Sequence, residues 1–144
     1  MRRRALGVLL LVAVSLVGCA ATPRHAEALS QRVVVERYLD ALNRRDLLVL
    51  TAYVTPDVEW YSVVDGKRIT EVSGRDALTQ MLQTFFARTA HASWHIESAL
   101  EQERYLAVRE LSQWQDADGT GERTSLCVYE FDDGRIRRIT YFLN

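Results

Sequence analysis

The chain has 144 residues, with 18 Lys and Arg against 19 Asp and Glu and a formal net charge of −1 at pH 7. This length fits one domain with an N-terminal extension, and the lack of a basic block beyond the first residues argues against a nucleic-acid partner. Two cysteines and three histidines, without a CxxC or HExxH motif, give no reason to expect a metal or another cofactor.

Residues 1–18 have the pattern of a bacterial signal peptide. Three arginines precede an uncharged apolar run from Ala5 to Val17, which is shorter than the roughly 20 residues of a membrane-spanning helix. The run Leu16-Val17-Gly18-Cys19 resembles a lipobox, in which the cysteine thiol takes a diacylglyceryl group. We therefore expect an exported lipoprotein anchored in a membrane through Cys19. Ala20 favours the outer membrane if the cell is Gram-negative.

The rest of the chain divides into a tether and a domain. Residues 19–29 read as the lipidated cysteine and a short tether, and residues 30–144 as one domain. If Cys19 carries the lipid, Cys127 has no partner for an intramolecular disulfide.

The first half of the domain has helical periodicity. Apolar residues recur at three- and four-residue steps after Ser30, which predicts a helix. Asp46 is placed to cap a second short helix that ends near Tyr53, and Thr55-Pro56-Asp57 is typical of a turn. We expect Ser73 to cap a third helix. Its apolar stripe comprises Leu78, Met81, Leu82, Phe85 and Phe86.

Strand patterns account for the other segments. Residues 58–63 and 67–72 flank the hairpin turn Asp65-Gly66. Further strands are predicted over residues 92–101, 104–116, 122–131 and 135–143, with Asp118-Gly119 and Asp133-Gly134 as turns. This order of elements predicts an α+β domain in which three helices pack on one face of an antiparallel sheet.

Three segments resemble the SnoaL-like, or nuclear transport factor 2-like, superfamily over Ser30 to Asn144. They are VVERYLDALNRRDLLVLTAYVTPDVEWYS, SGRDAL and YEFDDGRIRRITYF. The resemblance implies a cone, in which a curved sheet wraps around the helices and encloses a pocket. Its members include isomerases, cyclases, dehydratases and binding domains, so the fold does not decide the function.

Comparison with the ketosteroid isomerases of this superfamily singles out three positions. Tyr38 falls on their oxyanion tyrosine, Ser62 stands where their general-base aspartate stands, and Cys127 replaces their second aspartate. Serine alone is not basic near neutral pH, and a thiol is a poor hydrogen-bond donor. We therefore do not expect steroid isomerisation by that mechanism, although the resemblance still implies a pocket.

Strand alternation and one assumed register give a candidate pocket lining. Leu111 opposite Cys127 and Arg109 opposite Tyr129 would place cationic and polar groups on the pocket face. The predicted ligand-binding residues are Tyr38, Trp60, Ser62, Arg109, Gln113, Cys127 and Tyr129. Such a lining suits an anionic or carbonyl-bearing ligand. The alternatives are structural: aromatic core residues, a buried thiol, and an Arg109 ion pair with Glu97 or Glu110.

Three functions remain open. The leading interpretation is a cell-envelope lipoprotein that binds a small molecule or acts as an accessory domain, without established catalysis. The second is an acid–base enzyme of the isomerase, cyclase or dehydratase type. It would use Tyr38 together with His95, which shares a strand face with Glu97, or with another carboxyl group. The third is an interaction module, for an envelope protein or a second copy. Its predicted outer face contains Glu110, Ser112, Trp114, Val128 and Glu130.

Overall fold

The computed structural model describes residues 29–143. The predicted signal peptide, the lipobox with Cys19 and nearly all of the predicted tether lie outside the described residues. Within residues 29–143, no helix combines the length and the apolar composition that crossing a bilayer requires.

The helices and strands of the described chain follow one another in the order that the sequence pattern predicts. They are α1 (Gln31–Asn43), α2 (Leu47–Ala52), β1 (Val54–Val64), β2 (Lys67–Ser73), α3 (Arg75–Arg88), β3 (His91–Gln102), β4 (Tyr105–Asp116), β5 (Gly119–Asp132) and β6 (Arg135–Leu143). The strands form one sheet in the order β2-β1-β6-β5-β4-β3. The expected α+β class is confirmed. The sheet is not purely antiparallel, because β6 runs parallel to β1.

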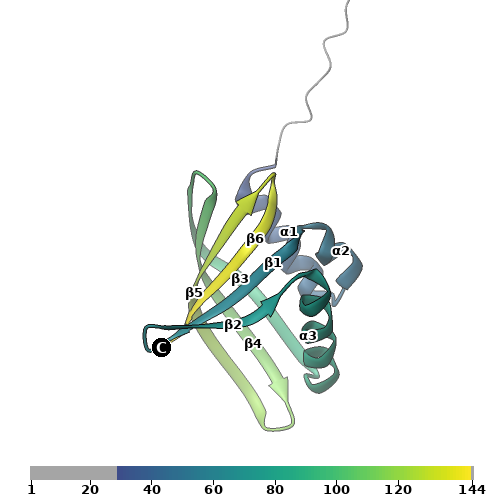
Figure 1. Cartoon of the computed structure of the whole chain (residues 1–144). Coiled ribbons are helices and arrows are strands. Elements are labelled where there is room, and N and C mark those ends of the chain that lie inside the picture. Colours follow the sequence, from purple (N-terminus) through teal and green to yellow (C-terminus); the bar gives the residue numbers. More distant parts are fainter. Residues whose placement is uncertain (1–28, 144) are drawn as a thin grey trace, which may run out of the picture.

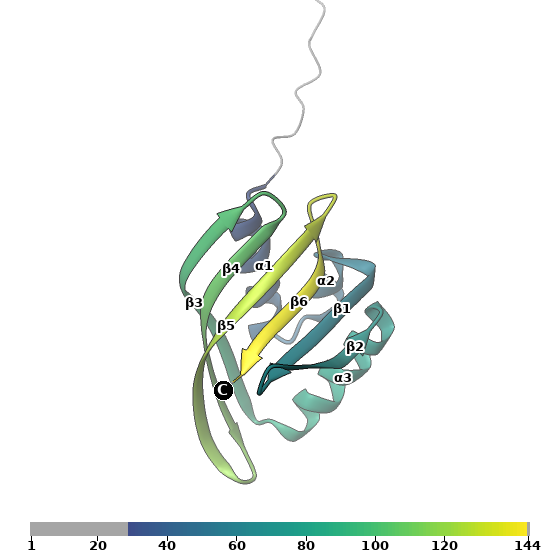
Figure 2. The ribbon, with the colours of Figure 1, turned by 60° about the vertical axis from the view of Figure 1, so that its left-hand side comes forward.

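The sheet curves around the helices. All three helices lie on its concave side, while the other side carries no helix among the described residues (Figures 1 and 2). Apolar side chains from both layers meet between them and are buried. The largest fully buried aliphatic ones are Leu50, Leu78, Leu106, Ile136 and Ile139. Burying this surface is the main force that holds helices and sheet together.

The helix starts follow local hydrogen bonding. Asp46 caps α2 as predicted, since its carboxylate accepts from the Val49 N–H at 3.1 Å. The predicted Ser73 cap of α3 is wrong, because Gly74 occupies the cap position with φ +92°. That backbone conformation favours glycine, and it lets the Gly74 N–H donate to the Val58 carbonyl at 2.8 Å.

The predicted turn over residues 55–57 is also wrong, because these residues belong to β1. The pairing of β1 with β6 is irregular here: Val54 pairs with Ile136, and regular pairing resumes only at Glu59. An irregular ladder tolerates Pro56, which has no N–H to donate. The residues that are typical of a turn therefore mark an interruption of the pairing between β1 and β6, inside a strand.

Candidate functional site

The register of β4 and β5 decides which side chains enter the cone. Cys127 pairs with Val108 and Tyr129 with Leu106, so the predicted register is wrong by three residues. An odd shift exchanges the two faces of a strand. Arg109 and Gln113 therefore lie on the strand face opposite the core, and Glu110 takes the inward position.

Glu110 is a carboxyl group in the core of the cone. The residue is 1% exposed, and its two oxygens accept hydrogen bonds from the hydroxyls of Tyr129 at 2.8 Å and Tyr141 at 2.6 Å. Burial raises the pKa of the Glu110 carboxyl, and the two phenol donors oppose this shift without cancelling it. The group is therefore placed to hold a proton more tightly than an ordinary glutamate.

Two further side chains complete this cluster. Tyr38 of α1 is buried, and its ring meets that of Tyr129 edge-on with the centroids 6.4 Å apart. Burial and the charge of Glu110 raise the pKa of Tyr38 and of Cys127. Both groups keep their protons near neutral pH, so Tyr38 is a hydrogen-bond donor and Cys127 is an inert thiol.

A cavity of about 60 Å³ adjoins the cluster. It is lined by Tyr38, Leu42, Trp60, Met81, Leu82, Phe85, Trp94, Ile139 and Tyr141. The Trp60 ring lies 5.4 Å from that of Tyr141, and its buried indole N–H has no hydrogen-bond partner within residues 29–143. A single water needs roughly 10–15 Å³. The cavity can therefore hold several waters or a small organic group.

Apart from Tyr38 and Trp60, none of the predicted site residues that the structure describes lines this cavity. Ser62 is buried beside Tyr141, with which it pairs on the neighbouring strand, but it does not line the cavity. Arg109 is exposed and forms an ion pair with Glu97 at 3.0 Å, so the structural alternative holds for it. His95 is exposed on the edge strand β3, outside the cavity, and thus does not join Tyr38 in an acid–base pair.

The predicted interaction face is split by the same register shift. Val128 and Glu130 lie on the outer side of the sheet, but Glu110, Ser112 and Trp114 share the opposite strand face. The Trp114 ring covers Gly121 so closely that no Cβ would fit there. A single interface built on these five residues is therefore wrong.

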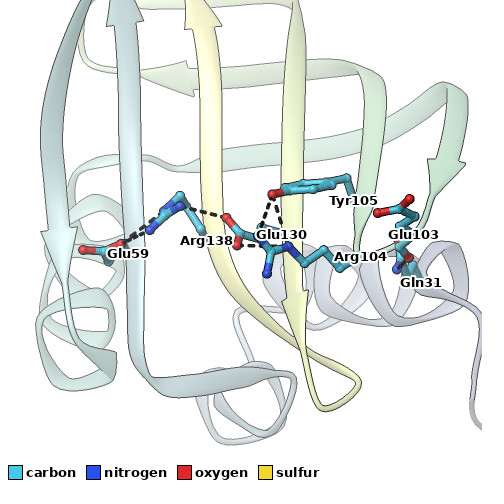
Figure 3. Close-up of polar contacts among 7 residues, drawn as sticks. All are labelled: Gln31, Glu59, Glu103, Arg104, Tyr105, Glu130 and Arg138. Atoms are coloured by element: carbon cyan, nitrogen blue, oxygen red, sulfur yellow. Dashed lines mark hydrogen bonds and ion pairs between the residues drawn. The ribbon is translucent and has the colours of Figure 1, made fainter.

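Charged groups on the outer face form a separate network (Figure 3). Arg138 reaches Glu59 and Glu130, each at 2.8 Å, and Arg104 approaches Glu130 at 3.6 Å. The Arg138 guanidinium holds the pKa of Glu59 below its usual range. These ion pairs link β1, β6 and β5 across the sheet. Their mutual pairing identifies a structural network rather than a vacant binding site.

Sequence reasoning missed two residues of the inner cluster, Glu110 and Tyr141. In the pair Arg109-Glu110 both side chains are charged, so alternation alone cannot say which of them turns inward. Tyr141 carries a helpful signal, because it shares a strand face with buried Ile139. Only the observed pairing of β4, β5 and β6 brings the Glu110 carboxyl and the hydroxyls of Tyr129 and Tyr141 together.

Solved structures with the same architecture come from several bacteria. A nuclear transport factor 2-like protein of unknown function from Burkholderia pseudomallei is 20% identical, with a TM-score of 0.68 over 79% of this chain and 90% of that one. An epoxide hydrolase from Mycobacterium tuberculosis gives 20% identity and a TM-score of 0.67, over 79% and 82%. A protein with a ketosteroid isomerase-like fold from Catenulispora acidiphila, solved with trimethylamine, gives 11% and 0.65, over 77% and 85%.

These identities establish a shared fold and nothing about the reaction or the ligand. No curated protein sequence matches the chain significantly. The family comparison is more specific, since residues 35–139 match the model of the SnoaL-like domain. That match covers most of the chain and agrees with the resemblance seen in its sequence, so the chain belongs to the SnoaL-like domain family.

Proposed function

We propose that this protein is a membrane-anchored lipoprotein whose SnoaL-like domain binds a small, mostly apolar ligand with one hydrogen-bond acceptor. The observation that carries the proposal is the Trp60 indole N–H, which is buried at the cavity and unpaired among the described residues. An unsatisfied buried donor costs about 1–3 kcal/mol. A ligand oxygen placed against it, such as a carbonyl, recovers part of that cost.

The remaining cavity lining supports the same class of ligand. Tyr38 faces the cavity and keeps its proton, so its hydroxyl can serve as a second donor. The other lining groups are aromatic and aliphatic apart from the Tyr141 hydroxyl, which already donates to Glu110. Pockets of this kind use apolar walls for affinity and a few polar groups for orientation.

The test compares 2-butanone with 2-methyl-1-butene, which has the same shape but no oxygen. Both are titrated into the full chain while the methyl group of Met81, which lines the same cavity, is followed by NMR. We expect Trp60→Phe to weaken ketone binding roughly two- to tenfold, the worth of one hydrogen bond, and to leave alkene binding unchanged. Trp114→Phe, outside the cavity, serves as the matched control. An equal effect of Trp60→Phe on both probes would refute the proposed donor role.

A second candidate function is acid–base catalysis of the isomerase or cyclase type. Glu110 favours it, because burial raises the pKa of its carboxyl and so makes the carboxylate a stronger base than an exposed glutamate. Tyr141 lines the cavity and donates to Glu110, so it offers a proton path between a ligand and the carboxyl. Tyr38 would stabilise negative charge on the ligand oxygen.

Exchange of the α-protons of 2-butanone in D₂O, followed by NMR, distinguishes this enzyme from a binding domain. A catalyst accelerates exchange, and Glu110→Gln abolishes the acceleration while ketone binding persists. Glu122→Gln, an exposed change on β5, is the control. Exchange that is no faster with the protein than without it restricts the domain to binding.

Membrane anchoring is tested separately. The proposal places a diacylglyceryl group on Cys19 and export ahead of it, following the signal-peptide pattern of residues 1–18. Growth with labelled palmitate should label the wild-type chain and leave Cys19→Ser unlabelled and released from the membrane fraction. Cys127→Ser should keep both label and membrane association. A labelled Cys19→Ser chain would contradict the anchor.

A further inference from the structure

A second, larger space adjoins the cavity on the outside. An open groove of about 760 Å³ lies between the C-terminal half of α3 and the turn that joins β4 to β5. Its lining comprises Met81, Thr84, Phe85, Arg88, Thr89, Asp116, Ala117 and Asp118. Figure 1 shows the end of α3 and this hairpin turn at the same end of the molecule. The Ala90 N–H donates to the Gln115 carbonyl at 2.9 Å and fixes one end of the groove.

Met81 and Phe85 belong to both spaces. Each lines the 60 Å³ cavity and the 760 Å³ groove, so their side chains are the boundary that the two have in common. Four α3 residues with helical spacing, positions 81, 84, 85 and 88, form one wall of the groove. Methionine has three rotatable side-chain bonds. The boundary can therefore open by a side-chain rotation, without a change in the fold.

The volumes indicate that the two spaces serve one ligand. Sites for small molecules usually measure about 300–1,000 Å³, and the cavity alone is far below this range. The groove is within it, and its lining combines the apolar side chains of Met81 and Phe85 with the charged side chains of Arg88, Asp116 and Asp118. The buried Trp60 donor, the shared wall of Met81 and Phe85 and the open groove therefore follow one another.

We propose that the ligand is an elongated amphiphile, whose hydrogen-bond acceptor sits at Trp60. Its apolar chain passes between Met81 and Phe85 and lies along α3 in the groove. This inference rests on the proposed ligand-binding function and adds the length and shape of the ligand to it.

A series of methyl ketones from 2-butanone to 2-decanone tests the inference with the full chain. The Trp60 indole N–H reports the inner end by NMR, and the Met81 and Ala117 methyl groups report the passage and the groove. We expect the affinity to rise about fourfold for each added CH₂, the gain from burying one methylene. Affinity that peaks at the shortest ketones and then falls would overturn the inference while leaving the proposed function intact.

Two exposed positions on α3 provide a matched pair of variants. Thr84 lines the groove, and its neighbour Gln83 does not. Thr84→Trp fills the groove and should weaken 2-decanone binding at least tenfold without changing the binding of 2-butanone, whereas Gln83→Trp should change neither. Equal effects of the two variants on 2-decanone would also overturn the inference. If no ketone of any length shifts the Trp60 signal, the proposed function fails together with it.

Discussion

At the scale of single residues, Glu110 sets the chemical character of the cone. Its carboxyl is buried, both of its oxygens accept from phenols, and no cation faces it in these contacts. Removing a charged carboxylate from water is costly even when hydrogen bonds remain. The protein therefore carries, next to its cavity, a carboxyl group that keeps its proton to higher pH than an exposed glutamate does.

This has a defined consequence for stability. Because the pKa of Glu110 is higher in the folded state, its stabilising contribution is full below the unfolded pKa and is lost as pH rises through the folded pKa. Because glutamine does not ionise, we expect the Glu110→Gln variant to be more stable than wild type at pH 8. In acid, where wild-type Glu110 is protonated, the variant should have no such advantage. Urea unfolding between pH 4 and 8 measures the difference, with exposed Glu71→Gln as the control. Parallel stability curves for wild type and Glu110→Gln would contradict the burial cost.

At the scale of elements, the sequence predicts type and position well and register poorly. Periodicity locates all three helices, and Asp65-Gly66 and Asp133-Gly134 form the predicted hairpin turns with positive φ at both residues. Asp118-Gly119 has the same signal, but there the turn lies one residue earlier. The Asp116 carboxylate accepts from the Asp118 N–H at 2.9 Å, and Asp116 pairs with Gly119.

The error in register explains most of the site errors: Tyr129 pairs with Leu106 and not with Arg109, a difference of three residues. Moving the turn by one residue shifts the pairing by two and leaves each side chain on its own face. The third residue comes from the length assumed for the loop, and this odd remainder turns every side chain of the strand over. Arg109 left the predicted pocket and Glu110 entered it for this reason alone. The predictions for Tyr38 and Trp60 do not depend on this register. Helix periodicity places Tyr38 on α1, and the pairing of β1, which the hairpin near residue 118 does not affect, places Trp60.

The start of α3 offers a direct test of an element boundary. Gly74 has φ +92°, and an added Cβ would meet nothing closer than 3.9 Å, so the cost of Gly74→Ala is backbone strain rather than a clash. We expect Gly74→Ala to lower the free energy of unfolding by about 1–3 kcal/mol. Ser73→Ala should change it by less than about 0.5 kcal/mol, because Ser73 is not the cap. Chemical denaturation gives both values, and a larger loss for Ser73→Ala would restore the sequence-based assignment.

At the scale of the whole molecule, the two faces of the sheet respond to pH in opposite directions. The inner face holds Glu110, whose pKa is raised by burial. The outer face holds Glu59, whose pKa is lowered by hydrogen bonds from Arg138. Protonation of Glu59 at low pH and ionisation of Glu110 at high pH therefore each destabilise the folded protein. Its stability should be greatest at the pH values between these two titrations.

Two variants separate these limits. The lowered pKa of Glu59 means that its contribution is present above the unfolded pKa and is lost as pH falls through the folded pKa. Because Glu59 is 30% exposed, we expect Glu59→Gln to cost only about 0.2–1 kcal/mol near neutral pH and nothing in strong acid. Arg138 keeps its 2.8 Å contact with Glu130 in this variant. In the double variant Glu59→Gln and Glu110→Gln, stability should depend less on pH at both the acid and the alkaline end of the range. A double variant that retains the wild-type curve would place the responsible groups elsewhere.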